Sequence, residues 1–273
     1  MKRRQLVELH ELRWFPRLWR DLLTDFMSFF ARSFRPYAAI ADCLHAAMLR
    51  CGDKTILDLC SGAAEPVLTV QEELARQGIS VSVTITDLYP NEQVFKRLET
   101  ERRPLVRCLL RSIDAVRVPP ELEGFRTFFS AFHHFQPKEA ALIFADTVRT
   151  GRGIGVFEYT ERSLLRWGPL ILFMPVLVWA ATPFIRPCSA ARLLWTYVIP
   201  VVPLVAAWDA LVSVFRSYHP DELLALARRS GDGRYQWTAG RVKTRAGLRI
   251  TYLLGVPADA APPCPPVGNA TDT

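Results

Sequence analysis

The feature that most constrains the fold of this chain is a regular alternation of strand and helix patterns between Lys54 and Glu158. Strands are predicted at Lys54–Cys60, Val81–Asp87, Leu105–Ser112, Arg126–Ala131 and Ile154–Glu158, and helices at Ala63–Gln77, Asn91–Arg102 and Pro137–Thr150. Such alternation predicts a parallel sheet with helices on both faces. Ligands of these folds bind at the carboxyl ends of the strands, so we expect functional residues directly after them.

Two long apolar segments, Leu164–Ile185 and Leu193–Phe215, interrupt this pattern. Each is close to the roughly 20 residues that span a bilayer. The prolines within them remove backbone donors and favour kinks; they are Pro169, Pro175, Pro183, Pro200 and Pro203. We predict a broken helical hairpin over residues 163–215 that dips into a membrane or faces lipid. A two-pass membrane anchor and an insert buried within protein are the alternatives.

The soluble pattern resumes after this insertion. A short amphipathic helix is predicted over Pro220–Arg229, and the strands Tyr235–Val242 and Leu248–Leu254 are predicted to form an antiparallel hairpin. Residues 216–257 would thus complete the core that begins with residues 51–162. The proline- and alanine-rich tail, residues 258–273, is predicted to be unstructured.

The N-terminal residues 1–50 are expected to form a helical cap. Apolar side chains recur at helical spacing from Leu6 to Phe34 and arginines lie on the other faces, which predicts an amphipathic helix that is broken or begins at Pro16. Three roles remain open for this helix: lying in a bilayer interface, capping the binding cleft, or simply packing on the core.

Charge and cysteine usage limit the compartment and the partners. The net charge of +7 suggests an anionic neighbour, such as a membrane surface or nucleic acid, although many soluble proteins are basic. The six cysteines show neither close pairing nor metal-ligand spacing, so we expect reduced thiols and no metal site. The N-terminus lacks the apolar run of a secretory signal. We therefore predict a cytoplasmic protein.

The turn after the first strand, ILDLCSGAAEP, has the outline of a strand, a ligand-binding loop and a helix. Loops that bind phosphate use several glycines. This loop has only Gly62, and it carries the acid Glu65, which the dipole of the following helix also favours. The loop is therefore a poor phosphate cradle, which disfavours a nicotinamide dinucleotide as ligand.

Together these elements, over Lys54–Pro257, resemble a class I S-adenosylmethionine-dependent methyltransferase. The matching motifs are ILDLCSG, TITDLYPN, SIDAVRVP and FFSAFHHFQP, followed by a strand ending in Glu158 and by the final hairpin. The hairpin discriminates best, because nicotinamide-binding folds usually continue with parallel strands. The resemblance implies a doubly wound, seven-stranded, mostly parallel α/β sheet with a C-terminal antiparallel hairpin and an apolar helical insertion. It also implies S-adenosyl-L-methionine as the cofactor.

The resemblance carries specific cofactor contacts. Asp58 would meet the cationic methionyl part and Gly62 would let the backbone pass close to the ligand. Asp87 would accept hydrogen bonds from the ribose hydroxyls, unless it is a simple turn aspartate. The full implied set is Asp58, Cys60, Gly62, Asp87, Leu88, Ile113, Asp114 and Ser130. Cys60, Ala64 and Pro66 stand where the family commonly has glycine, which puts the loop shape in question.

Two further groups of residues are candidates for the acceptor side. His133 and His134 follow the fourth strand and could orient an acceptor or remove its proton. Because adjacent side chains on an irregular segment diverge, we expect only one of them to face the cleft. Asp209 and Arg216 lie with Ser213 on one helical face, and Tyr218 follows; they either bind the substrate or form a structural Asp209–Arg216 ion pair.

The function expected from the sequence is methyl transfer to a hydrophobic or lipid-like small molecule by in-line displacement. The protein would act in the cytoplasm at the inner face of the membrane, and nucleic acid is not expected as a partner because the long apolar insertion does not suit a polyanion. The alternatives are a non-catalytic membrane-associated scaffold with the same fold and an NAD(P)-dependent oxidoreductase.

Overall fold

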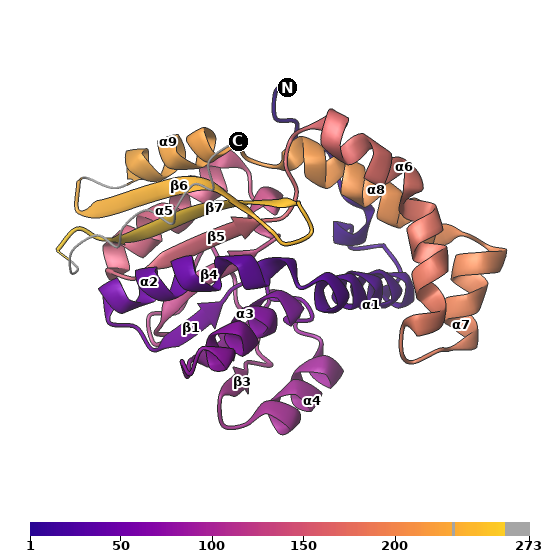
Figure 1. Cartoon of the computed structure of the whole chain (residues 1–273), viewed down its shortest axis with the longest axis horizontal. Helices are drawn as coiled ribbons and strands as arrows, with labels where there is room; N and C mark the ends of the chain where they lie inside the picture. The colour runs from indigo at the N-terminus through magenta and orange to yellow at the C-terminus, as the bar shows by residue number, and fades with distance from the viewer. Residues whose placement is uncertain (231–232, 260–273) are drawn as a thin grey trace.

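The structure, a computed structural model, describes residues 1–230 and 233–259 and contains a seven-stranded sheet in the order β3-β2-β1-β4-β5-β7-β6 (Figure 1). The strands are β1 (Thr55–Asp58), β2 (Ser82–Ile85), β3 (Val106–Cys108), β4 (Phe125–Phe129), β5 (Ile154–Glu158), β6 (Tyr235–Lys243) and β7 (Arg249–Pro257). The first five run parallel, and β7 is antiparallel to both β5 and β6. The predicted fold class is confirmed, including the hairpin.

Helices cover both faces of the sheet. They are α2 (Ala41–Cys51), α3 (Glu65–Arg76) and α4 (Glu92–Arg102) on one face, and α5 (Pro137–Thr150) and α9 (Pro220–Ser230) on the other. Successive strand residues point to opposite faces. In β1, Ile56 therefore joins the core under α2 and α3, whereas Leu57 joins the core under α5 and α9.

Local sequence signals explain where these helices begin and end. Pro137 occupies the first turn of α5, where the missing amide costs nothing. The Gln136 amide donates to the Glu139 carboxylate at 2.8 Å as part of a capping box. Gly151 ends the helix with a φ of 65°, a conformation that glycine adopts without strain. The predicted bounds of α5 and β5 are therefore reproduced.

A second, helical layer projects from the sheet. It consists of α1 (Arg17–Phe34), α6 (Leu164–Ala181), η4 (Thr182–Phe184), α7 (Ala190–Leu193), the π-helical turn η5 (Leu194–Val198) and α8 (Val201–Arg216). The helices α6 and α8 pack side by side (Figure 1). The helix α1 contacts α8 of this layer and α3 of the sheet's cover. The N-terminal cap and the apolar insertion thus share one small core, centred on Phe26, Val178 and Val205.

The N-terminus agrees with the expectation that the amphipathic helix is broken or begins at Pro16. The helix begins at Arg17, after Pro16, and the preceding residues contain only the short 3-10 turn η1 (Leu9–Glu11). Polar groups of this segment bond to α8 instead; the Leu9 amide donates to Asp209 at 2.7 Å. The helix α2 was not predicted as a separate element. Of the predicted unstructured tail, residues 260–273 lie outside the described residues.

Candidate functional site

The carboxyl ends of β1, β2, β4 and β5 meet at one edge of the sheet. The strand order reverses between β1 and β4, because the chain places β2 and β3 on one side of β1 and places β4 and β5 on the other. This is the position at which doubly wound sheets bind ligands. Two groups of side chains lie there. We call the first the carboxylate loops, residues 58–64, 87–89 and 112–116. The second is the histidine cluster, which comprises Glu8, His10, Glu11, His133, His134, Glu158, Asp209 and Arg216.

The loop after β1 keeps an unusual backbone despite its single glycine. Cys60, Gly62 and Ala64 have φ values of 58°, 54° and 63°. Non-glycine residues rarely adopt this left-handed conformation, and such strain concentrates at functional sites. A Cβ on Gly62 would meet no atom within 4 Å, so the loop is open toward a ligand there. The replacement of glycine at positions 60 and 64 therefore leaves the alternating loop geometry intact.

Asp87 connects this loop to the loop after β2. Its carboxylate accepts hydrogen bonds from the amide of Gly62 at 2.9 Å and from the amide of Tyr89 at 2.8 Å. Its carbonyl accepts from the Ile113 amide at 2.9 Å, which adds the third loop. Leu88 is exposed beside it. The carboxylate and the backbone carbonyl of Asp87 therefore together hold the three loops in register at the sheet edge.

The remaining residues of the carboxylate loops differ in exposure. Asp114 is exposed, and its carboxylate accepts from the Val116 amide at 2.9 Å, whereas Ile113 is buried against the α5-side core. Asp58 is 2% exposed and accepts from the Thr127 hydroxyl at 2.7 Å. Burial raises the pKa of Asp58 to about 7, against the opposing effect of that hydrogen bond. A cation near Asp58 would favour its charged form.

Ser130, directly after β4, sits in a strained turn with a φ of 47°. Its hydroxyl contacts the hydroxyl of Tyr37 and accepts from the Tyr159 amide at 3.3 Å. Tyr37 belongs to the 3-10 turn η2 (Pro36–Ile40), so the N-terminal cap reaches the sheet edge here. The turn directs the following residues away from the sheet and into η3 (Phe132–His134).

His133 is held by Glu158, the last residue of β5. One carboxylate oxygen accepts the amides of Phe132 at 2.7 Å and His133 at 3.2 Å, and the other lies 2.7 Å from His133 Nδ1. The second ring nitrogen, Nε2, is buried, has no hydrogen-bond partner in the part of the chain that the structure describes, and lies 3.4 Å from Glu8 Oε1. Burial lowers the pKa of His133, but Glu158 and Glu8 outweigh it and raise the pKa to about 10.

His134 lies beside His133, with ring centroids 4.3 Å apart and a tilt of 32°. The expectation that the two side chains diverge is therefore wrong, because the tight turn η3 keeps both rings against the N-terminal segment. His134 Nδ1 contacts Glu11 and lies 3.6 Å from Glu8 Oε2. Burial and the neighbouring His133 lower the pKa of His134. The two adjacent histidines thus differ in their electrostatic surroundings.

The polar face of α8 is occupied by the same N-terminal segment. Asp209 Oδ2 lies 2.9 Å from His10 Nδ1, and the Ser213 hydroxyl donates to Glu8 at 2.8 Å. Arg216 donates to Glu11 at 2.8 Å and to the His134 carbonyl at 2.9 Å. The helical spacing does gather these groups on one face. In the described residues, however, Asp209 and Arg216 pair with the N-terminal segment rather than with each other.

Tyr218, the last candidate for substrate binding, is buried beside this face. Its hydroxyl donates to the Phe135 carbonyl at 2.8 Å, and the Arg3 guanidinium lies 4.1 Å from the ring centroid. Arg3 also donates to the carbonyls of His133 and Arg216, at 3.1 Å and 2.6 Å. Tyr218 therefore packs the junction between η3, the N-terminus and α8.

Sequence reasoning missed several residues of the histidine cluster. Glu158 carries a signal that could have found it, because a carboxylate that ends a fully buried strand requires partners. Glu8, His10 and Glu11 carry no such signal. They lie in a segment that was interpreted as part of an amphipathic helix, and their partners are about 120 to 205 residues away.

Comparisons with known proteins agree with this architecture. No protein-family model and no curated protein matches the sequence. Among solved structures, the plantazolicin methyltransferase BpumL in complex with SAH superimposes with a TM-score of 0.52 at 8% identity, covering 92% of this chain and 94% of that one. An O-methyltransferase family protein from Burkholderia thailandensis gives a TM-score of 0.51 at 14% identity, covering 87% and 59%.

This chain spans about half to three fifths of the first methyltransferase structures that it matches, which are longer, whereas it matches BpumL over nearly the full length of both chains. At these identities the likeness concerns the fold. It agrees with the strand order, the antiparallel β7 and the position of the loops at the sheet edge. This chain therefore has the fold of the class I S-adenosylmethionine-dependent methyltransferases.

Proposed function

We propose that this protein is an S-adenosylmethionine-dependent methyltransferase that acts on a hydrophobic, lipid-like small molecule. The observation that carries this proposal is the loop after β1, whose positive φ values at three alternating positions persist with only one glycine and whose Gly62 amide is held by Asp87. A strained backbone that is retained against residue preference indicates a ligand contact.

The residues present fit this cofactor. Its methionyl part is cationic and would lie near Asp58, whose burial favours a cationic neighbour over an anionic one. Its two ribose hydroxyls would donate hydrogen bonds to the Asp87 carboxylate, because both carboxylate oxygens can accept. Asp114 would accept from the adenine amino group, with Leu88 and Ile113 beside the ring. Cys60 and Ser130 would contact the cofactor from the loops after β1 and β4.

Bound S-adenosylmethionine would supply a sulfonium-activated methyl group, which the acceptor takes by in-line displacement. Alignment alone contributes on the order of 7–11 kcal/mol to such a step, so positioning is the main task of the protein. Glu158 holds His133 through Nδ1, and because the pKa of His133 is raised to about 10 the ring is protonated near neutral pH, so His133 would help to position the acceptor rather than take its proton. Asp209, Arg216 and Tyr218 would border the acceptor on the opposite side.

The preference for a lipid-like acceptor is supported by the exposed apolar surface of the helical layer. In the membrane-length helix of residues 164–184, only 17% of the most apolar window is buried. Large apolar side chains are exposed along this layer: Leu165, Leu172, Phe173, Phe184, Val198 and Leu204. Large apolar side chains that are exposed together on a soluble protein indicate that this surface binds a membrane or a partner protein. The excess of arginine and lysine suits the anionic inner face of a cytoplasmic membrane.

A membrane-dipping arrangement suits this layer better than two straight spans. The helices on either side of residue 200 meet at an angle of 69°. The far end of α8 carries Asp209 and Arg216, which are buried against the N-terminal segment and η3 rather than facing outward. We therefore propose that the end of the layer near α7 enters the headgroup region while the carboxyl end of α8 remains with the sheet.

Two measurements test the enzymatic proposal. Isothermal titration calorimetry of the purified protein should show saturable binding of S-adenosylmethionine and no comparable binding of NADH. Mass spectrometry of lipid and metabolite extracts from cells expressing the protein should then show an acceptor shifted by 14 Da. Absence of cofactor binding refutes the methyltransferase proposal. Cofactor binding without any methylated product would instead favour the scaffold alternative.

Vesicle flotation tests the membrane proposal. The protein should float with vesicles that contain anionic lipid, and Leu172→Glu together with Phe173→Glu should reduce the bound fraction at least tenfold, because each apolar side chain contributes about 1.5–3 kcal/mol when buried. Leu142→Glu is the matched control, since Leu142 is 56% exposed on α5, a helix that covers the sheet and does not belong to the helical layer. Equal loss in the control, or no flotation of the wild type, would contradict membrane binding through this layer.

A further inference from the structure

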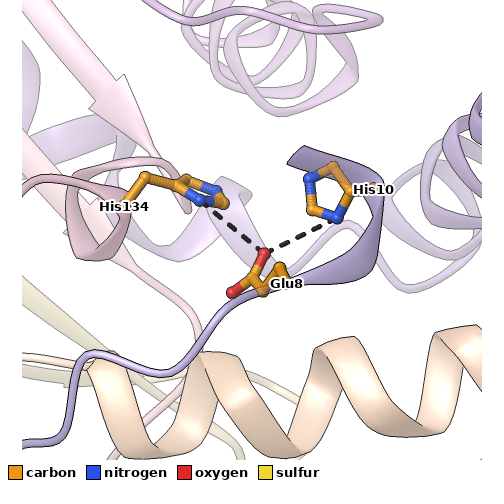
Figure 2. Close-up of side chains that lie close together, drawn as sticks. All are labelled: Glu8, His10 and His134. Atoms are coloured by element: carbon orange, nitrogen blue, oxygen red, sulfur yellow. Dashed lines mark ion pairs between the residues drawn. The ribbon is translucent and has the colours of Figure 1, made fainter. Parts of the chain in front are cut away.

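Three side chains of the histidine cluster converge on one point. Glu8 and His10 come from the N-terminal segment, and His134 comes from η3, which follows β4. Figure 2 shows His10 and His134 approaching the Glu8 carboxylate from opposite sides. The Nδ1 atoms of His10 and His134 each lie 3.6 Å from Glu8 Oε2, and one ligand atom from each of the three residues lies within 4.8 Å of the other two.

These separations are close to those of a coordinated metal ion. Zinc binds imidazole nitrogen and carboxylate oxygen at about 2.0–2.2 Å, so a tetrahedral arrangement separates two such ligands by about 3.4 Å. The observed nitrogen-to-oxygen distances of 3.6 Å need only a small side-chain adjustment to match it. Two imidazoles and one carboxylate are also a donor set that suits transition metals and that Mg²⁺ and Ca²⁺ disfavour.

The charges around the three residues favour a cation. Glu8 is 1% exposed, and an ionised carboxylate at such a site requires a compensating charge. Glu11 and Asp209 add two more carboxylates, which contact His134 and His10 at the same Nδ1 atoms. Arg216 contacts Glu8 at 3.8 Å and Glu11 at 2.8 Å. With Glu158 and His133 included, four carboxylates thus surround three imidazoles and one guanidinium, and a divalent ion would balance the excess of carboxylates over the guanidinium when the imidazoles are neutral.

An independent observation points into the same cluster. His133 is 3% exposed, and its Nδ1 contacts Glu158. Among residues 1–230 and 233–259 its Nε2 has no hydrogen-bond partner, and it lies 3.4 Å from Glu8 Oε1. A buried polar atom without a partner is costly, and a bound ion or water is one of the usual reasons for it. Nε2 of His133 thus points at Glu8, the residue that would supply the carboxylate ligand of the ion.

We propose that Glu8, His10 and His134 bind a divalent transition-metal ion of the Zn²⁺ type. Glu8 supplies a carboxylate oxygen, and each histidine supplies Nδ1, releasing to solvent any proton that this atom carries. Each Nδ1 gives up its present contact to Asp209 or Glu11 on binding the ion, and these two carboxylates then lie close enough to join the ligand set. The ion ties the N-terminal segment to the turn after β4, so it fixes the segment that covers His133. This proposal concerns metal binding and stands apart from the methyl-transfer proposal.

Calorimetric titration of the full-length protein with Zn²⁺, after dialysis against a chelator, tests the site. We expect one equivalent of Zn²⁺ to bind and the melting temperature to rise with metal. Co²⁺ should give the visible absorption bands of a nitrogen- and oxygen-coordinated ion. His10→Ala should weaken Zn²⁺ binding at least tenfold, and Glu8→Gln should do the same while keeping the size of the side chain. Mg²⁺ at equal concentration should not compete.

His219→Ala is the matched control, because His219 also pairs with a carboxylate, at 3.0 Å from Asp221, but lies outside the cluster. Its Zn²⁺ affinity should equal that of the wild type. His10 has a side chain that is 36% exposed, so His10→Ala decides the question if Glu8→Gln fails to fold. Failure of the wild type to bind Zn²⁺, or equal binding by wild type and His10→Ala, overturns the proposal.

Discussion

The carboxylate loops and the histidine cluster lie at the same edge of the sheet but are assembled differently. In the carboxylate loops, Asp87 and Asp114 accept hydrogen bonds from backbone amides two to twenty-five residues away, as between Asp87 and the amides of Tyr89 and Gly62, and only Asp58 bonds to a distant side chain, the hydroxyl of Thr127. In the histidine cluster, side chains meet side chains across about 200 residues, as between His10 and Asp209. Local backbone geometry therefore determines the first region, and tertiary packing determines the second.

The largest expected effect is a loss of turnover without a loss of cofactor affinity, when the histidine cluster is changed and the carboxylate loops are left intact. His133→Ala should lower kcat by about 10²–10⁴-fold, because His133 is proposed to position the acceptor at the methyl group. The affinity for S-adenosylmethionine should stay within twofold of the wild type, because His133 is not among the carboxylate loops. Single-turnover kinetics and calorimetry measure the two quantities. An equal loss of cofactor affinity would show that the regions are not independent.

For Asp87→Ala, in the carboxylate loops, we expect a loss of cofactor affinity. Two lost hydrogen bonds to the ribose, each to a charged group, should weaken cofactor binding by about 100-fold or more. The loop after β1 also loses the contact of its Gly62 amide, so a smaller loss is expected for Asp87→Asn, which retains one acceptor oxygen. Calorimetry with both variants measures the difference. Asp221→Ala, at a carboxylate that is 87% exposed, should behave as the wild type.

The pH dependence of cofactor binding tests the burial of Asp58. Burial raises the pKa of Asp58 to about 7, so the carboxyl is largely protonated below that pH and ionised above it. A cationic ligand needs the ionised form. The dissociation constant of S-adenosylmethionine should therefore be constant above pH 7 and should rise by up to tenfold per pH unit below it. Asp58→Asn should remove this pH dependence; its persistence would assign it to another group.

The same pKa shift has a consequence for stability. The ordinary pKa of Asp58 is 3.8, so the folded protein without ligand binds this proton more tightly than the unfolded chain does. The contribution of Asp58 to the free energy of unfolding should consequently be largest below pH 4 and should fall as the pH rises from 4 to 7. Comparison of urea unfolding for wild type and Asp58→Asn across this range isolates that contribution.

The smallest expected effect concerns the histidine cluster alone. Ser213→Ala removes the hydroxyl that donates to the buried Glu8 carboxylate at 2.8 Å, and it should lower the free energy of unfolding by about 1–2 kcal/mol. Ser28→Ala is the matched control, since the Ser28 hydroxyl donates only within its own helix, to the Thr24 carbonyl. The control should stay within about 0.5 kcal/mol of the wild type. If both variants lower the free energy of unfolding equally, the Ser213 hydroxyl of α8 does not stabilise the buried Glu8 carboxylate.

The sheet and its helices were predictable because their signals are local. The period-2 and helical patterns identify β1 to β5 and α3 to α5 within a few residues, and Pro137 and Gly151 mark the ends of α5. The positions of Asp87 and Asp114 after their strands follow from the same patterns, although their roles in binding remain predictions. The start of α1 after Pro16 was predictable because proline is tolerated only in the first turn of a helix, although the apolar spacing before Pro16 continues the helical period.

By itself, the sequence determined the fold and the loop that follows β1, because strand and helix periodicity and turn chemistry act over a few residues. The tertiary structure alone decided the partners of Asp209 and Arg216 and the convergence of Glu8, His10 and His134. The physical reason is that these groups carry no shared periodicity. Buried charges must find partners wherever the packed chain brings them, and only the folded arrangement of α8, η3 and the N-terminal segment supplies those partners.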